Sequence, residues 1–290
     1  MIDSYMDIAK RHDFTFLVDV ENGNPNGDPD AGNLPRIDPE TMHGLISDGA
    51  IKRKIRNWVD IKKGTEEHFK IYIQDKGIAL NELHQRAYTA KKIVSTGSKQ
   101  KPDEIEEVQR WMRENFFDIR TFGAVMNMSV NCGQVHGPLQ IMFARSVDPI
   151  LPLDMAITRV AVTKIGEDKT TEMGRKAFVP YGLYRGYGFF VPHYAKRSEC
   201  TEEDLTLVWD ALQNMWEIDR SAARGMMSLK GLYIFSHENP LGNAPAHRLF
   251  ERVAAKLKQG VTVPRHITDY AITVNDVDLP DGITLKRIEP

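Results

Sequence analysis

Basic side chains cluster on the first predicted helix of the chain, residues 47–59. Apolar side chains recur there at helical spacing, and Ser47 or Asp48 suits the capping position. The cations that fall together on a neighbouring arc are Lys52, Arg53 and Arg56. Such an arc suits binding to a polyanion, and it equally suits a solvated helix face. Both interpretations stay open on these residues alone.

Carboxylates gather in the loop before that helix, residues 21–38, which is dense in Gly, Pro, Asn and Asp. Asp28, Asp30 and Asp38 offer oxygen ligands for Mg²⁺ and hence metal-dependent cleavage of a phosphodiester. Asp in an Asn-Gly-Asp-Pro context also forms turns by bonding its own backbone. We favour turn formation, so we predict no metal and no cofactor, and we expect neither helix nor ladder to continue through the loop.

Three histidines, His12, His43 and His136, offer a second route to phosphodiester cleavage, without a metal. That chemistry needs two imidazoles to converge on one phosphate, and no spacing in the sequence indicates such a pair. We therefore interpret the histidines as structural and assign no catalytic residue.

Composition limits the class of protein. The 290 residues carry a net charge of −2, with 41% hydrophobic and 27% charged residues, so nucleic-acid binding must come from local clusters. Two cysteines, Cys132 and Cys200, are too few for a disulfide framework. No signal peptide is evident and no apolar run approaches about 20 residues, so we expect a cytoplasmic protein without a membrane partner.

Periodicity predicts an α+β chain. Setting insertions aside, the expected elements are strand 13–20, helix 47–59, strand 137–145, strand 184–191, helix 202–219 and strand 229–236. Their βαββαβ order predicts a ferredoxin-like fold, the fold of the RNA-recognition motif. We expect a single domain over residues 1–290.

Two insertions and a tail complete the predicted organisation. A helical block with a short strand at 69–73 and helices at 81–94 and 102–116 forms an insertion over residues 65–130. Two β-prone arms around a charged tip predict a projecting hairpin over 156–183. The tail is expected to hold a helix at 247–258 and short strands within 270–288.

A glycine-aromatic run, Arg185 to Pro192, matches the first five positions of the third-strand consensus of RNA-recognition motifs. Phe190 stands where that consensus has Val, and Pro192 stands where it ends in an aromatic residue. We take the run as support for the topology more than for a platform on which bases stack.

With these residues in view, the chain resembles the repeated backbone subunit of type I CRISPR surveillance complexes (Cascade), closest to the type I-C branch. The resemblance lies in VENGNPNGDPDAGNLPRID, DIRTFGA, HGPLQIMFARSVDPI and TEMGRKAFVPYGLYRGYGFF, which span most of the chain. It implies a recognition-motif-like palm, helical fingers and a hairpin thumb. It also implies a structural role, in which stacked copies hold CRISPR RNA and present it to a target DNA strand.

The resemblance implies a set of RNA-binding residues and partners. The residues are Arg36, Ser47, Lys52, Arg53 and Arg56 near the first helix, and Met173, Arg175 and Lys176 on the thumb. Met173 would wedge between guide bases. The partners would be CRISPR RNA, target DNA, other copies of the chain, and the large, small and RNA-processing subunits.

Two alternatives belong to other classes of protein. One is an endoribonuclease, because related subunits of type III complexes resemble this fold and cut RNA with a loop aspartate. The other is a stand-alone single-stranded-RNA binder that forms no filament.

Overall fold

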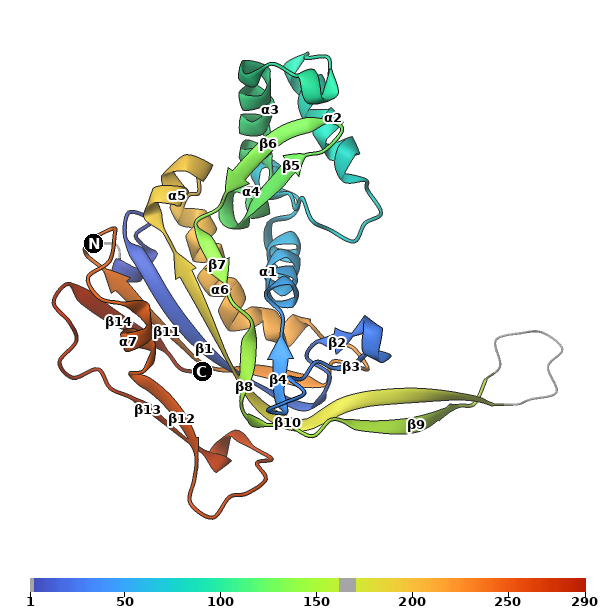
Figure 1. Ribbon diagram of the computed structural model, residues 1–290, viewed down its shortest axis with the longest axis vertical. Coiled ribbons are helices and arrows are strands. Elements are labelled where there is room, and N and C mark those ends of the chain that lie inside the picture. The colour runs from blue at the N-terminus through green and yellow to red at the C-terminus, as the bar shows by residue number, and fades with distance from the viewer. Residues whose placement is uncertain (1–2, 162–170) are drawn as a thin grey trace.

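A central antiparallel sheet organises the computed structural model, which describes residues 3–161 and 171–290 (Figure 1). The strands follow the order β14 (Ile283–Ile288), β11 (Met226–His237), β1 (Arg11–Gly23), β10 (Glu172–Phe190), β8 (Ala144–Pro149) and β4 (His43–Ile46). A short strand, β7 (Leu139–Ile141), also pairs with β10. The predicted mixed α and β chain built on an antiparallel sheet is confirmed.

Two helices, α1 (Asp48–Lys63) and α6 (Glu202–Ile218), cover one face of this sheet. Their apolar faces pack on alternate β1 residues such as Phe14 and Phe16 in one buried cluster. Side chains cap both helices: Ser47, one of the two predicted candidates for α1, accepts a bond from the Ala50 N–H, and Thr201 forms a capping box on α6. Along the chain the elements of this layer run β1, α1, β7 with β8, β10, α6 and β11.

The opposite face of the sheet is covered by the C-terminal segment. Its elements are α7 (Ala246–Phe250) and the paired strands β12 (Val253–Leu257) and β13 (Tyr270–Val274). The predicted helix at 247–258 is therefore wrong beyond residue 250. Leu249, Val253 and Leu257 do have helical spacing, but residues 253–257 form a ladder with β13, and this tertiary pairing overrides the local pattern.

A block between α1 and β7 has a core of its own. It comprises α2 (Leu80–Lys91), α3 (Pro102–Asn115), α4 (Phe117–Phe122) and the hairpin strands β5 (Gly123–Asn127) and β6 (Asn131–His136), at the top of Figure 1. Side chains from α2, α3, β5 and β6, together with Ile119 of α4, meet in a cluster that includes Leu83, Met112 and Val135. The hairpin is an addition to the helical block expected from the sequence.

The strand predicted at 69–73 is absent, and a carboxylate takes the place of a ladder partner. Asp118 in α4 accepts hydrogen bonds from the backbone N–H of Tyr72 at 2.8 Å and of Ile73 at 3.0 Å. Only a single bridge, between Lys70 and Phe116, has β geometry here. Phe69, Ile71 and Tyr72 are buried against neighbouring elements instead, whereas Ile73 is exposed.

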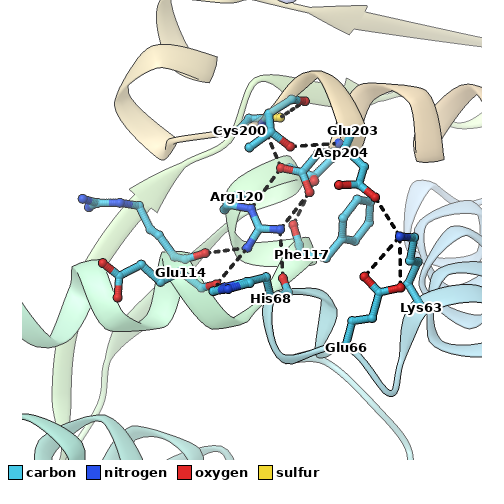
Figure 2. Close-up of polar contacts among 12 residues, drawn as sticks. Lys63, Glu66, His68, Glu114, Phe117, Arg120, Cys200, Glu203 and Asp204 are labelled. Carbon is cyan, nitrogen blue, oxygen red and sulfur yellow. Dashed lines mark hydrogen bonds and ion pairs between the residues drawn. The ribbon is translucent and has the colours of Figure 1, made fainter.

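A buried ion pair joins the helical block to the central layer. The guanidinium of Arg120 in α4 donates to both carboxylate oxygens of Asp204 in α6, at 2.9 and 2.8 Å, and to the carbonyls of Arg113 and His68 (Figure 2). Asp204 also belongs to the capping box of α6. Because every donor and acceptor finds a partner, the charges are tolerated in the interior.

A hairpin projects away from the rest of the molecule (Figure 1). β9 (Leu153–Arg159) pairs with the first seven residues of β10, from Glu172 to Phe178. The predicted return arm and the predicted strand at 184–191 are one continuous strand. The first predicted arm begins earlier, at residue 153, and its end at 162–165 lies outside the described residues, as do residues 166–170 of the predicted tip. The rest of the predicted tip, up to residue 176, is wrong, because residues 172–176 continue β10 and pair with β9.

The loop at 21–38 contains more structure than expected, because β2 (Gly27–Asp28) and β3 (Leu34–Pro35) pair with each other. The remaining elements are α5 (Pro192–Ser198) and the 3₁₀ turns Ser4–Met6, Pro29–Ala31, Glu67–Phe69, Gly97–Lys99 and Ile267–Asp269. Within the part of the chain that the structure describes, no helix has the length and apolar character needed to span a membrane.

Candidate nucleic-acid interface

An arginine-lined cleft of about 420 Å³ lies where the 21–38 loop meets the start of α1. Its described lining holds three arginines and no carboxylate. The lining residues, here called the arginine cleft, are Asn24, Asn26, Gly27, Pro29, Asn33, Arg36, Ser47, Gly49, Ala50, Arg53, Ser221, Ala223 and Arg224. Three of the predicted site residues, Arg36, Ser47 and Arg53, thus come together.

The walls of the arginine cleft are tied to one another by backbone contacts. Arg224 donates to the carbonyls of Asn24 at 3.0 Å and Pro25 at 2.7 Å, and Asn26 Oδ1 accepts from the Ser47 N–H at 2.9 Å. The turn after α6 therefore fixes the loop, and the loop fixes the start of α1. Sequence reasoning missed Arg224, although a cation just after a predicted helix was a visible signal.

Arg53 is the most available cation of the cleft. Its exposed side chain makes no ion pair with any described residue, whereas Lys52 and Arg56 are each paired. Below it, burial together with Arg224 and Arg53 lowers the pKa of Lys54, whose Nζ contacts the carboxylate of Asp219. Arg53 and Arg224 both line the cleft, and their positive charges favour an anion there.

Arg36 and Ser47 contribute in different ways. The Arg36 guanidinium lies 3.4 Å from Asp28 Oδ1, which offsets part of its charge, and its buried Nε has no partner among the described residues. Ser47 Oγ accepts from the Ala50 N–H at 3.3 Å and caps α1. The positive end of the α1 dipole therefore faces the cleft.

A second hollow, of about 340 Å³, lies on the other side of Arg53 and is here called the helix hollow. Its lining residues are Gly49, Arg53, Arg56, Asn57, Asp60, Ile71, Ile73, Gln74, Asp75 and Lys76. Arg56 is mostly buried, with a 12% exposed side chain, and its Nε donates to Asp118 Oδ2 at 2.7 Å. Lys52 pairs with Asp48 at 3.0 Å and lies outside both hollows.

A third hollow, of about 370 Å³, lies between the 21–38 loop and the projecting hairpin. Its lining residues, here called the hairpin hollow, are Ala31, Gly32, Asn33, Leu34, Asp154, Arg175 and Ala177. The guanidinium of Arg175 contacts Asp154 across the hairpin. Farther along, Met173 is 75% exposed beside Thr158, and Lys176 lies over the Phe178 ring.

The three hollows adjoin one another. The hairpin hollow and the arginine cleft share Asn33, and the arginine cleft and the helix hollow share Gly49 and Arg53. They form a track, here called the basic track, with Arg175 in the hollow at one end, Arg36, Arg224 and Arg53 in the middle, and Arg56 in the hollow at the other end. No single stretch of sequence contains these residues.

The loop carboxylates form turns. Asp28 Oδ1 accepts from the Asp30 N–H at 3.3 Å and caps a 3₁₀ turn, and Asp38 Oδ1 accepts from the Glu40 N–H at 3.1 Å. Hydrogen bonds, first from the Thr41 hydroxyl and then from the Glu40 N–H, lower the pKa of Asp38. In residues 3–161 and 171–290, no three His, Cys, Asp or Glu side chains are placed to hold a metal ion.

The three histidines have separate environments. His12 is buried between Ser236 and the Asp7 carbonyl, and His43 contacts the Ser146 carbonyl at 2.7 Å. His136 stacks on Tyr194, with ring centroids 4.0 Å apart. The three imidazoles therefore contact three different sets of partners and do not converge on one site.

The glycine-aromatic run in β10 is enclosed on both faces. Gly186 and Gly188 lie under the rings of Phe16 and Phe14 on the helix-covered face. Tyr187 and Phe189 lie on the other face and pack on Phe250, with ring centroids 4.8 and 5.8 Å away. The C-terminal segment therefore occupies the surface on which bases would stack in an open sheet.

A comparison with protein families decides the affiliation of this chain. The family model described as "CRISPR-associated protein Cas7" matches residues 10–275, most of the chain and all three hollows. The chain belongs to the Cas7 family. The residues of the basic track are therefore residues of a Cas7 protein.

Individual relatives are distant. A Cas7 protein of Haloferax volcanii is 23% identical over 237 residues, covering 72% of this chain and 66% of the relative, so the match spans just under two thirds of its length. A chain of a solved "CRISPR RNA-guided surveillance complex, pre-nicking" has a TM-score of 0.52 at 14% identity, with 78% of each chain covered. A chain of another "CRISPR RNA-guided surveillance complex" reaches 0.44 at 14% identity, covering 78% of this chain and 68% of its own. The first likeness supports the fold.

Proposed function

We propose that this Cas7 chain is the CRISPR RNA-binding backbone subunit of a Cascade-type surveillance complex, of the type I-C branch. The observation that carries the proposal is the basic track, at whose centre Arg53 makes no ion pair with any described residue. The type I-C assignment rests on the sequence resemblance. The membership in the Cas7 family and the titles of the similar complexes support the rest.

The chemistry of the track suits phosphates more than base edges. Arginine guanidinium groups, asparagine amides and the N-terminus of α1 all bind phosphate oxygens, and such contacts carry no sequence information. A guide RNA differs in sequence from one spacer to the next, so its holder must bind without reading bases. A local track also allows RNA binding by a chain with a net charge of −2.

In this proposal, the central sheet with α1 and α6 is a ferredoxin-like palm, the block around α2 and α3 is the fingers, and the β9–β10 hairpin is the thumb. The single domain would bind RNA along Arg36, Ser47, Lys52, Arg53 and Arg56, with Arg175 and Lys176 at the thumb and Met173 as the wedge. Copies of the chain would stack along one RNA, which multiplies weak individual contacts. The filament would present the guide to target DNA and contact the large, small and RNA-processing subunits.

The proposal is tested by co-expression with a CRISPR repeat-spacer RNA, followed by size exclusion and RNA extraction. We expect RNA to co-purify with an oligomer of the protein. Arg53→Ala should weaken binding roughly tenfold for unrelated RNA sequences alike, because a charge-assisted contact to a phosphate is lost. Arg197→Ala is the matched control, since Arg197 is an exposed arginine on α5 outside all three hollows. Protein that recovers neither RNA nor an oligomer would refute the proposal.

The endoribonuclease alternative makes a separate prediction. It requires Asp28 or Asp30 to hold a metal, but Asp28 already caps a turn and lies beside the Arg36 guanidinium. We expect labelled RNA to remain intact with the purified protein and Mg²⁺. Cleavage that disappears in Asp28→Ala would favour the enzyme.

A further inference from the structure

The helix hollow differs in chemistry from the arginine cleft beside it. Ile71 and Ile73 form an apolar wall, and the Ile73 side chain remains 45% exposed. Arg53, Arg56 and Lys76 contribute three positive charges, and Asp60 and Asp75 contribute two negative ones. Lys76 Nζ lies 3.0 and 2.9 Å from the two Asp60 oxygens, which neutralises that pair. A phosphate is therefore less favoured here than in the arginine cleft, whose described lining has no carboxylate.

One wall of the helix hollow is rigidly held. Asp118, 1% exposed, accepts bonds from the backbone N–H groups of Tyr72 and Ile73 and from Arg56 Nε. The same carboxylate therefore fixes the 71–73 segment opposite α1 and the guanidinium between them. The hollow is therefore formed in the absence of a ligand, which lowers the free energy needed to order the site on binding.

Two amide side chains in the hollow have no hydrogen bond to any described residue: Asn57 on α1 and Gln74 on the facing segment. Each amide offers both a donor and an acceptor, so together they can satisfy the edge of any nucleobase. An apolar wall combined with such groups suits a neutral, flat, hydrogen-bonding ligand. An apolar side chain from a second protein copy would use the wall and leave both amides unsatisfied, so it fits less well.

The position of the hollow identifies the strand that supplies this ligand. Gly49 and Arg53 belong to both the helix hollow and the arginine cleft, so a group in one is adjacent to a group in the other. We propose that the helix hollow holds one nucleobase of the RNA strand whose phosphates occupy the arginine cleft. This rests on the proposed RNA-binding function and adds a base site to it. Asn57, Ile73 and Gln74 contact the base, and Asp118 is a positioning residue.

Equilibrium binding to two strands tests the base site: an RNA oligonucleotide and a ribose-phosphate strand of equal length that lacks bases. The native protein should prefer the RNA roughly tenfold, the effect of holding about one base. Asn57→Ala with Ile73→Ser should reduce this preference and leave binding of the base-free strand unchanged. Ile61→Ser is the matched control, because Ile61 is 70% exposed on α1 and lies outside the hollow. An undiminished preference in the double variant would overturn the base site while leaving phosphate binding intact.

Photo-crosslinking supplies a readout that a merely structural effect would not produce. RNA containing 4-thiouridine should crosslink to Asn57 or to residues 71–76, as mapped by mass spectrometry of the native protein. Crosslinks confined to other segments would refute the base site alone. Failure to bind either strand would refute the proposed function, and the base site with it.

Discussion

At the scale of single residues, the three cations of the α1 arc have different fates. Lys52 pairs with Asp48 one turn earlier, and Arg56 is held by a buried carboxylate from α4. Arg53, between them in sequence, faces the arginine cleft without a counter-ion among the described residues. Of these three cations, Arg53 therefore carries the charge that is available to a ligand. Substituting Arg53 is the most direct test of RNA binding by this helix.

The burial of His12 predicts that the folded protein loses stability in acid. Its imidazole is fully buried in β1, and burial is the main cause that lowers its pKa from 6.5 to about 4. The unfolded chain gains a proton near pH 6.5 that the folded chain gains only near pH 4. Stability is therefore expected to fall as the pH drops through this window, by about 3 kcal/mol at most.

Urea unfolding of the native protein and His12→Gln at pH 7.5 and pH 4.5 measures this effect. The variant should lose less stability on acidification than the native protein does, because the titrating group is gone. His247→Gln removes an exposed histidine on α7 and should keep the native pH dependence. An equal loss in His12→Gln would show that other groups cause the acid sensitivity.

At the scale of elements, the glycine-aromatic strand has a packing explanation. A Cβ at Gly188 would lie 2.1 Å from Phe14 Cζ, and one at Gly186 would lie 2.1 Å from Phe16 Cζ. The two glycines stand opposite these aromatics in the β1–β10 register, so each ring lies flat across the neighbouring strand. The alternation that resembles a base-stacking motif thus allows β1 to place its rings beneath α1 and α6.

Gly188→Ala is expected to destabilise the protein by about 1–3 kcal/mol, because the added methyl group overpacks a buried ring. The free energy of unfolding in urea measures the change. Gly49→Ala is the control, since no atom lies within 4 Å of its added Cβ and Ala favours a helix, so stability should stay level or rise. A Gly188→Ala variant as stable as the native protein would show that the Phe14 ring has room to move.

At the scale of the whole molecule, the projecting hairpin leaves an apolar surface uncovered. Leu153, Met155 and Ile157 alternate along β9 and share one face of the hairpin, and the last two are 53% and 50% exposed. A row of exposed apolar side chains on a protruding element marks an interaction surface. In the proposed filament, a neighbouring copy covers this face.

The filament hypothesis predicts that assembly depends on RNA length. Particle mass, measured by light scattering, should rise in steps as single-stranded RNA is lengthened, because each added segment accommodates another copy. Met155→Asp with Ile157→Asp should weaken this assembly while a single copy still binds a short RNA. Val277→Asp alters an equally exposed apolar residue near β13 and should assemble normally. A particle mass independent of RNA length would favour a stand-alone RNA binder.

The sequence by itself determined the local elements and the polarity of their faces. The Ser47 cap and the apolar stripe of α1 follow from short-range patterns, and the structure has them. Such patterns give the wrong secondary structure where contacts with residues distant in the chain determine the backbone conformation. Residues 71–73 are held by Asp118, and residues 253–257 pair with β13.

Only the tertiary structure decided which charges are free and which surfaces are open. The basic track joins residues from the 21–38 loop, α1, the turn after α6 and the hairpin, which lie up to about 200 positions apart. The sequence showed the cations of α1 as equals, and the fold separates them, because Asp118 pairs with Arg56 whereas Arg53 makes no ion pair with any described residue. The fold also places Phe250 over Tyr187 and Phe189 of β10. Covering this face of the sheet removes more apolar surface from water than leaving it exposed would.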